Sequence, residues 1–524
     1  MNTLLTMLSA TVLLPPLTDE ESAAAAAKLG ELSGLRVYPS SLAASGGAVF
    51  FLARTEGHKL LGILSKEGHA TPAAFVGEEK AFRENGEKYQ LQVSPLDHVN
   101  AAALRRALPY TGPVPLGLQK SVGFGDRLGL ATPGHVRAVR GTGLAPIFAQ
   151  QSIREMARTG RAPEQVLDDA TWGVFQEGWR QGFGADADHL KTASDIDRCA
   201  PVGFTLFTID PGDHVDNDAD ADPPGILKGK IEDLPWADLE SSPQMMRAAY
   251  LGEAFDLGDG FSISFSDEDL LRAAAKYGKA VAHTVNLYRH LAGRMADRPF
   301  ELEISVDETE TPTSVYEHFF VASELKRLGV RWVSLAPRFV GRFEKGVDYI
   351  GDLAGFERDF VWHVAVARHL GPYKLGLHSG SDKFSIYPIV ARHAGKLVHL
   401  KTAGTSYLEA LRAVASIDPS LFRQVLTFSL EHYQQDKASY HVSADRTKVP
   451  APDQLADLEL VGVLDRFDGR QLLHVTFGSV LTAKGSDGRY LFRDRLISAL
   501  AGDEESYYAA LEAHLGRHVG LFAG

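Results

Sequence analysis

Between residues 183 and 191 the chain has the sequence Phe183-Gly184-Ala185-Asp186-Ala187-Asp188-His189-Leu190-Lys191, which begins apolar and ends in acidic and basic residues. A short apolar run that ends in polar residues before a helical stretch is typical of a β/α unit on a parallel sheet. In a barrel built from such units, catalytic groups project from the carboxyl ends of the strands. We therefore expect a buried strand here, with Asp188 and His189 at a functional site.

The same pattern recurs along the rest of the chain, and eight such strands predict a closed TIM (β/α)8 barrel in the α/β class. Long gaps after the third and seventh strands predict insertions at about residues 211–299 and 405–470. The expected strands lie at residues 122–130, 183–189, 204–210, 300–307, 330–337, 374–378, 396–401 and 472–477.

The first part of the chain has a different pattern of apolar segments. An alanine-rich run at residues 21–32 predicts a helix, and short apolar pieces at 48–52 and 60–64 predict strands. A segment rich in proline and glycine at residues 111–115 then interrupts the pattern. We expect a small N-terminal α+β appendage at residues 1–115, followed by a catalytic barrel domain at residues 116–524.

The composition of the chain argues against several classes of function and partner. The 524 residues carry a formal charge of -13 without a cluster of lysine and arginine, which argues against a nucleic-acid partner. The single cysteine, Cys199, excludes an intrachain disulfide and fits a reducing compartment, so any metal must be bound by His, Asp or Glu. The apolar start of the chain lacks the basic segment of a signal peptide, and we find no run long enough to span a membrane. We expect a cytoplasmic protein, either monomeric or homo-oligomeric.

The candidate metal ligands stand at the ends of different expected strands. His189 and His378 offer imidazole, the commonest protein ligand for a borderline divalent ion. Strand alternation places Glu303, Ser305 and Asp307 on one face, where polar groups need partners. Two histidines and Asp307 would hold one divalent ion, such as Zn, Mn, Ni or Co, with positions open for a substrate. The alternative is a structural hydrogen-bond network at the barrel mouth.

Other polar residues near expected strand ends are candidates for substrate chemistry. Asp188 precedes a candidate ligand directly, so it suits a general base. Ser379 and its neighbours offer hydroxyl and amide groups, while Arg127, Arg338, Lys345 and Lys383 are candidate holders of a carboxylate, with surface ion pairing as the alternative for Lys345. The expected substrate contacts are Asp126, Arg127, Lys191, Arg338, Ser379, Asp382, Lys383 and His441.

Three further patterns are expected to carry no separate function. The acidic run at residues 213–222 lacks the glycine and the glutamate that a calcium loop needs. The glycines at residues 123–129 are misplaced by one position for a dinucleotide fingerprint. His514 and His518 share one face of an expected helix, and we interpret them as packed or exposed helix histidines rather than a second metal site.

Several motifs that follow one another in order resemble the tagaturonate epimerase family, from about residue 123 to the C-terminus. They lie at residues 305–313, 334–341, 345–352 and 377–383. The resemblance implies interconversion of D-tagaturonate and D-fructuronate with a divalent metal, and in some members C4 epimerisation between tagatose and fructose. Asp188-His189 and His378-Ser379-Gly380-Ser381 also resemble, more distantly, class II metal-dependent aldolases.

These resemblances suggest a mechanism for a small keto-sugar or keto-sugar acid. The inverted carbon lies β to the ketone, so its hydrogen is not acidified, and retro-aldol cleavage followed by aldol re-closure would invert it. Asp188 or Glu308 would accept the proton of the β-hydroxyl while a metal stabilises the charge. Transient oxidation by nicotinamide is the rival, but we find no nucleotide site. Alternatives for the whole protein are a class II-type aldolase, a sugar isomerase and a non-catalytic sugar-acid binding protein.

Overall fold

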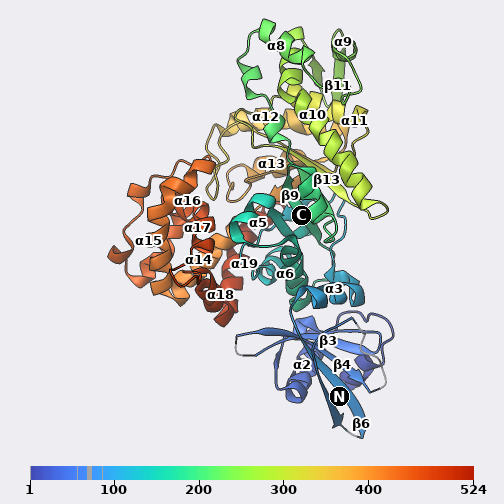
Figure 1. Cartoon of the computed structure of the whole chain (residues 1–524), viewed down its shortest axis with the longest axis vertical. Coiled ribbons are helices and arrows are strands. Elements are labelled where there is room, and N and C mark those ends of the chain that lie inside the picture. The colour runs from blue at the N-terminus through green and yellow to red at the C-terminus, as the bar shows by residue number, and fades with distance from the viewer. Residues whose placement is uncertain (1, 56, 68–73, 85, 524) are drawn as a thin grey trace.

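The computed structural model describes residues 2–523 except 56, 68–73 and 85. Its centre is a closed barrel of eight parallel strands (Figure 1). Around the barrel the strands follow the order β10-β13-β14-β15-β16-β7-β8-β9. The predicted TIM barrel is therefore confirmed. The barrel strands are β7 (Ser121–Gly123), β8 (Ala145–Ser152), β9 (Gly184–Leu190), β10 (Leu206–Ile209), β13 (Glu301–Val306), β14 (Ser334–Pro337), β15 (Lys374–Leu377) and β16 (Val398–Lys401).

One predicted strand was wrong and one real strand was missed. Residues 472–477, expected as the eighth strand, belong to α16 (Phe467–Val475) and the start of α17 (Phe477–Thr482). A short buried apolar run does not distinguish a helix from a strand, which explains the error. The missed strand is β8, all eight residues of which are buried. It ends in Gln150, Gln151 and Ser152 and carries no charge that would mark a strand end.

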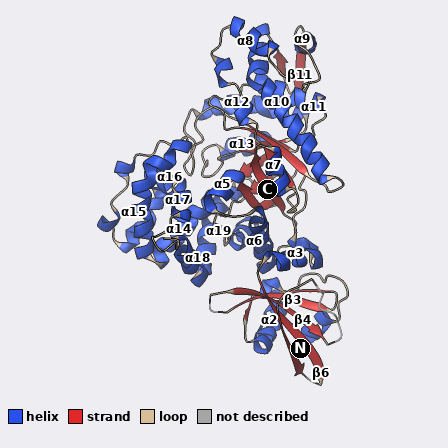
Figure 2. Cartoon of the chain, viewed as in Figure 1, coloured by secondary structure: helices blue, strands red, loops and turns tan. Residues whose placement is uncertain are grey.

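Helices follow the strands along the chain and cover the outside of the barrel, and Figure 2 shows α5, α6, α7 and α13 beside the central strands. Ser152 ends β8 and caps α5, because its hydroxyl accepts from the Glu155 amide at 3.1 Å in a capping box. This turn places the start of α5 at the barrel mouth. The covering helices are α4 (Thr132–Val139), α5 (Ile153–Thr159), α6 (Pro163–Gln176), α7 (Ala193–Cys199), α10 (Asp267–Met295), α11 (Val315–Arg327), α12 (Leu353–Leu370), α13 (Tyr387–Ala394) and α14 (Thr405–Ile417).

A second sheet precedes the barrel and lies at the bottom of Figure 1. It is antiparallel, with strands in the order β1-β3-β4-β6-β5 and β2 paired with β3. Trp172 and Phe175 of α6 pack into the core on one of its faces. The boundary at residue 115 remains a prediction. The elements here are α1 (Asn2–Leu8), α2 (Asp19–Ser33), β1 (Arg36–Val37), β2 (Ala43–Ser45), β3 (Ala48–Arg54), β4 (Lys59–Lys66), β5 (Glu78–Glu84), β6 (Glu87–Pro95) and α3 (His98–Ala107).

Two further groups of elements flank the barrel. One lies between β10 and β13 and contains α8 (Pro224–Glu232), α9 (Pro243–Tyr250), β11 (Ala254–Gly258) and β12 (Phe261–Ser264) in addition to α10. The other follows α14 and contains α15 (Pro419–Asp436), α16, α17, α18 (Arg493–Gly502) and α19 (Glu504–Gly520), in orange and red in Figure 1. In the described residues we find no helix with the length and apolarity to cross a membrane.

Candidate active site at the barrel mouth

The candidate site lies where the carboxyl ends of β9, β13, β15 and β16 meet. A small hollow there is lined by Asp188, His189, His378 and Lys401, among others. A larger hollow beside it has a volume of about 300 Å³ and is lined by Asp307, Glu308 and Arg338, among others. The two hollows share Arg154, Lys345, His378, Ser379 and Tyr440 in their walls. The strand-end residues Asp188, His189, Asp307, Glu308 and His378 are thus gathered around two adjoining hollows.

Lys401, the last residue of β16, is the cationic centre of the site. Its ammonium lies 2.6 Å from Glu303, 2.7 Å from Asp188 and 2.9 Å from Asp186. Burial alone lowers the pKa of a lysine, but these three carboxylates hold the pKa of Lys401 well above its usual value. A buried cation and its carboxylates fix one another, because removal of any partner leaves uncompensated charge.

The two aspartates of β9 differ in their titration. Burial raises the pKa of a carboxyl group, but Lys401 and the two histidines offset this and bring the pKa of Asp188 to about 2. Asp186 lies deeper and accepts a hydrogen bond from Thr208 at 2.9 Å, and burial raises its pKa to about 6. Asp188 is therefore the carboxylate that is ionised and also faces the small hollow.

His189 reaches the same hollow through an irregular backbone. Ideal strand alternation would send Asp188 and His189 to opposite faces. The β9–β10 register shifts at this point, and His189 has a φ of 53°, a left-handed conformation that non-glycine residues rarely adopt. Its Nε2 consequently lies 3.8 Å from Asp188 Oδ1. Such strain at a strand end is typical of functional sites.

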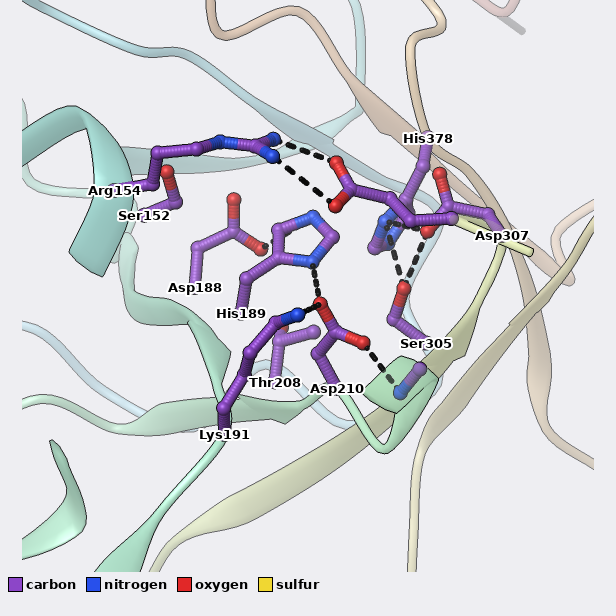
Figure 3. A network of polar contacts seen from close by, with 12 residues as sticks. Ser152, Arg154, Asp188, His189, Lys191, Thr208, Asp210, Ser305, Asp307 and His378 are labelled. Atoms are coloured by element: carbon purple, nitrogen blue, oxygen red, sulfur yellow. Dashed lines mark hydrogen bonds and ion pairs between the residues drawn. The ribbon is translucent and has the colours of Figure 1, made fainter. Parts of the chain in front are cut away.

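The two histidines face each other, and each has a carboxylate behind it. Their ring centroids are 5.1 Å apart, and Figure 3 shows His189 between Asp210 and the His378–Asp307 pair. His189 Nδ1 donates to Asp210 at 3.1 Å, and His378 Nε2 donates to Glu303 at 2.5 Å. The remaining nitrogens turn toward other candidate groups of the site, with His378 Nδ1 3.1 Å from Asp307 Oδ1 and His189 Nε2 3.8 Å from Asp188 Oδ1. Histidine ligands in metal sites are oriented in this way by a carboxylate.

The residues present fit a divalent cation. His189, Asp307 and His378 each offer one ligand atom within 4.8 Å of the others, a nitrogen and oxygen set that suits a borderline ion. Glu303 Oε2 is buried and finds no hydrogen-bond partner among the described residues. The surrounding carboxylates outweigh the effect of burial and raise the pKa of His189 to about 10 and that of His378 to about 9. The site thus has the negative potential that attracts a cation.

Glu308 lies in the wall of the larger hollow. Both of its oxygens accept from Arg154, at 2.6 and 3.3 Å. Burial raises its pKa, but His189, Lys345 and Arg154 more than offset this and lower the pKa of Glu308 to about 2. The carboxylate is ionised, but it is already occupied by a bidentate partner.

Four of the eight expected substrate contacts line the hollows. Arg127 lines the small hollow, Arg338 and His441 line the larger one, and Ser379 lines both. Arg127 also pairs with Glu155 at 2.6 Å and lies over the ring of Phe477. The other four expected contacts, Asp126, Lys191, Asp382 and Lys383, line neither hollow.

Those four residues are engaged elsewhere. The Asp126 carboxylate accepts three backbone amides between residues 128 and 131, at 2.7 to 3.0 Å, and so holds a turn. Lys191 pairs with Asp213 at 2.7 Å. Lys383 Nζ donates to three backbone carbonyls, and burial lowers its pKa to about 7. Asp382 belongs to a second cluster. The structure therefore does not bring these side chains to either hollow, and a role for them in substrate binding remains a prediction.

Sequence reasoning missed other residues of the site. Lys401 and Asp210 are the last residues of strands that were expected, at 396–401 and 204–210, so their position was a usable signal. Arg154 was missed because it follows β8, the strand that the sequence did not reveal. Tyr440 lies in the segment after α15, and no local pattern connects it with the barrel mouth.

The second cluster contains the residues Asp382, His514 and His518. Their ligand atoms also lie within 4.8 Å of one another. Arg470 donates to Asp382 at 3.0 Å and lies 3.0 Å from His514 Nε2. His518 accepts from the Asp382 amide at 2.8 Å and donates to the His514 carbonyl at 3.1 Å. Both histidines are packed, His514 Nε2 lies 2.6 Å from Asp382 Oδ1, and Arg470 contacts both of these side chains.

Comparison with known proteins gives concordant results. Residues 38–522 match the model of a family described as tagaturonate epimerase. The tagaturonate/fructuronate epimerase of Thermotoga maritima is 44% identical over 491 residues, which cover 94% of this chain and 98% of that protein. The native crystal structure of the fructuronate-tagaturonate epimerase UxaE from Cohnella laeviribosi has a TM-score of 0.87 at 41% identity, covering 95% of this chain and 99% of that one. A glycerol complex of that enzyme matches at 40% identity with the same TM-score and coverage.

Proposed function

The chain belongs to the tagaturonate epimerase family, and we propose that it interconverts D-tagaturonate and D-fructuronate in hexuronate catabolism in the cytoplasm. The observation that carries this proposal is the hollow at the barrel mouth. It brings an ionised carboxylate, Asp188, together with two histidines whose outer nitrogens are held by carboxylates. A proton acceptor and a site for a Lewis acid within one hollow are what cleavage and re-closure of a C–C bond require.

The substrate chemistry selects the reaction. The two sugar acids differ at a carbon that lies β to the ketone and carries a hydroxyl. The hydrogen on this carbon is not acidified by the ketone, so direct removal of that proton is disfavoured. Cleavage of the bond between this carbon and the carbon next to the ketone avoids the difficulty, because the inverted carbon becomes a planar aldehyde whose two faces are open to re-addition.

The residues of this chain have distinct roles in that reaction. Asp188 accepts the proton of the hydroxyl on the inverted carbon as the C–C bond breaks. The bonding electron pair stays with the fragment that carries the ketone, which becomes an enediolate. Lys401, 2.7 Å from Asp188, keeps the carboxylate ionised and oriented before the proton arrives. After the aldehyde turns, the enediolate attacks its other face and Asp188 returns the proton.

A divalent ion, such as Zn, Mn, Ni or Co, is part of the proposal. His189, Asp307 and His378 would hold it, and when bound it supplies Lewis-acid polarisation of the ketone. Asp210 and Glu303 keep the two imidazoles in the required orientation through hydrogen bonds to the nitrogens that face away. The negative charge of the surrounding carboxylates favours loading of the site.

Product analysis tests the proposed activity. Metal-loaded protein is incubated separately with tagaturonate, fructuronate, tagatose and fructose, and the products are followed by NMR. We expect conversion of each uronate into the other, and loss of conversion after chelation. The neutral pair reports whether the reaction extends to ketohexoses without a carboxylate. Absence of conversion of all four sugars would leave a sugar-acid binding protein as the better account.

A pair of matched variants assigns the proton acceptor. Asp188→Asn should lower kcat by about 10²- to 10⁴-fold, the range for loss of a general base, while the fold and metal content persist. Glu308→Gln should have a smaller effect on kcat, because Glu308 is engaged by Arg154. A larger loss in the Glu308 variant would exchange the two roles.

A further inference from the structure

The cations around the larger hollow are unequally partnered. Arg154, Arg338, Arg342 and Lys345 line it. Arg154 is paired with Glu308 at 2.6 Å, and Arg342 with Glu344 at 3.4 Å. Within the described chain, neither Arg338 nor Lys345 has a carboxylate within 4.0 Å. Lys345 donates to the Ser379 hydroxyl at 2.7 Å, and the structure gives the Arg338 side chain no hydrogen bond in the part of the chain it describes.

Arg338 combines a fixed backbone with a free side chain. It directly follows β14, and its amide donates to the Thr313 hydroxyl at 3.1 Å. Its carbonyl accepts from the Thr313 amide at 2.8 Å. The side chain is half-buried, and burial lowers the pKa of its guanidinium. A partly desolvated guanidinium with five unused donors is costly without an anion, and its fork geometry matches a carboxylate.

The position of Arg338 relative to the chemistry is also specific. The larger hollow that it lines contains Asp307 and His378, two of the candidate metal ligands, and is joined to the small hollow that contains Asp188. One extended six-carbon acid can therefore place its ketone at the histidines and its carboxylate in the larger hollow. Lys345, which lines both hollows, lies in the shared wall.

We propose that Arg338, assisted by Lys345, binds the carboxylate of the keto-hexuronate and thereby makes the site selective for sugar acids over neutral ketoses. This inference rests on the proposed function and adds the residues that bind the carboxylate of the substrate. The carboxylate is two C–C bonds from the inverted carbon. It therefore belongs to the aldehyde fragment, which a contact to the carboxylate would retain after cleavage.

Such an anchor explains how the aldehyde turns without escaping. With its carboxylate fixed on Arg338, the three-carbon fragment can still rotate about the bond between its hydroxyl-bearing carbon and the aldehyde carbon. This rotation exchanges the aldehyde oxygen and hydrogen and presents the opposite face to the enediolate. No atom is gained or lost, and no further reactant is needed.

Equilibrium binding tests the anchor without depending on turnover. The probes are D-altronate, in which the ketone of tagaturonate is reduced to an alcohol, and D-altritol, in which the carboxylate is reduced as well. Affinities are measured by calorimetry on the full metal-loaded chain. We expect wild type to prefer the acid, and Arg338→Met to lose roughly 100-fold in affinity for it with little change for the alditol, as expected for truncation of a buried charge pair.

Two further variants make the result specific. Arg338→Lys keeps the charge but not the planar fork, so it should recover only part of the preference. Arg342→Met removes a charge from the same wall, where the side chain is 59% exposed and paired with Glu344, and should leave the preference unchanged. Melting temperatures identify any variant that fails to fold, in which case Arg338→Lys carries the test.

The outcomes separate this inference from the proposed function. If wild type epimerises the uronates and Arg338→Met binds the acid as tightly as wild type does, the anchor is wrong and the function stands. If wild type epimerises nothing but Arg338→Met loses the preference for the acid, the anchor stands and the function fails. Equal wild-type affinity for acid and alditol, or an equal loss in Arg342→Met, would overturn the anchor.

Discussion

Two groups in this molecule consist of two histidines and one aspartate, but only one of them is suited to bind a metal ion. At the barrel mouth His189, Asp307 and His378 offer ligand atoms within 4.8 Å of one another, and all three line a hollow. Asp382, His514 and His518 satisfy the same distance criterion, but His514 Nε2 lies 2.6 Å from Asp382 Oδ1 and Arg470 contacts both side chains at 3.0 Å. The types of residue therefore do not define a metal site. What separates the two groups is whether a cationic side chain already contacts the candidate ligand atoms, as Arg470 does in the second group.

The two groups also titrate differently. At the mouth the excess of carboxylates raises the pKa values of both histidines. In the second group burial, together with the neighbouring His514 and Arg470, outweighs Asp382 and lowers the pKa of His518 to about 4. The first group is thus suited to hold a cation from solution. The second has its own cation and fixes the loop after β15 to the C-terminal helix α19.

The largest expected contrast is in metal content. His378→Ala should lose the ion and all measurable epimerisation, because removal of a ligand also frees Glu303 and Asp307 from their partner. His514→Ala is the matched variant and should keep the wild-type metal content. Elemental analysis of both purified proteins measures this. Loss of metal in the His514 variant alone would assign the ion to the second group.

A stability measurement tests whether the second group has a structural role. Arg470→Met leaves the buried Asp382 without its arginine, while Glu409 keeps Arg412 at 2.7 Å, and the change should cost about 3–5 kcal/mol of unfolding free energy. Its metal content should not change. Arg489→Met provides the control, because Arg489 is 88% exposed and should alter stability by less than about 0.5 kcal/mol. Urea denaturation of the three proteins gives the values, and equal stability of Arg470→Met and wild type would refute a structural role.

The smallest effect concerns pH. His518 has a folded pKa of about 4, below its unfolded value of about 6.5. Between these values the unfolded chain binds a proton that the folded chain does not, so stability is fully present above pH 6.5 and is lost as the pH falls toward 4. The contribution over this window is about 3 kcal/mol. Asp382, whose pKa Arg470 and the histidines lower, acts in the same direction at more acidic pH.

The difference between wild type and His518→Gln isolates this contribution from other titrating groups. Unfolding free energies are measured between pH 4 and 7.5. We expect the wild-type curve to fall more steeply than that of the variant below pH 6.5. Parallel curves would mean that folding does not lower the pKa of His518.

The local sequence predicted those site residues that directly follow an apolar strand. Asp188, His189, Asp307 and His378 each follow an apolar run, and the barrel rule then places them together. Lys401 was within reach of the same rule. The sequence did not reveal β8 or Arg154, because a strand that ends in uncharged residues has no polar signal. The Arg470 contact with Asp382 joins residues 88 positions apart, and local patterns do not contain such contacts.

The most direct test of the account is epimerisation of tagaturonate in deuterated water, followed by NMR of the fructuronate that forms. Cleavage and re-closure of the C–C bond leave the C–H bond of the inverted carbon intact, so we predict that the product carries protium at that carbon from the first turnover. Deuterium at the inverted carbon, appearing at the rate of epimerisation, would contradict the account and indicate proton abstraction at that carbon.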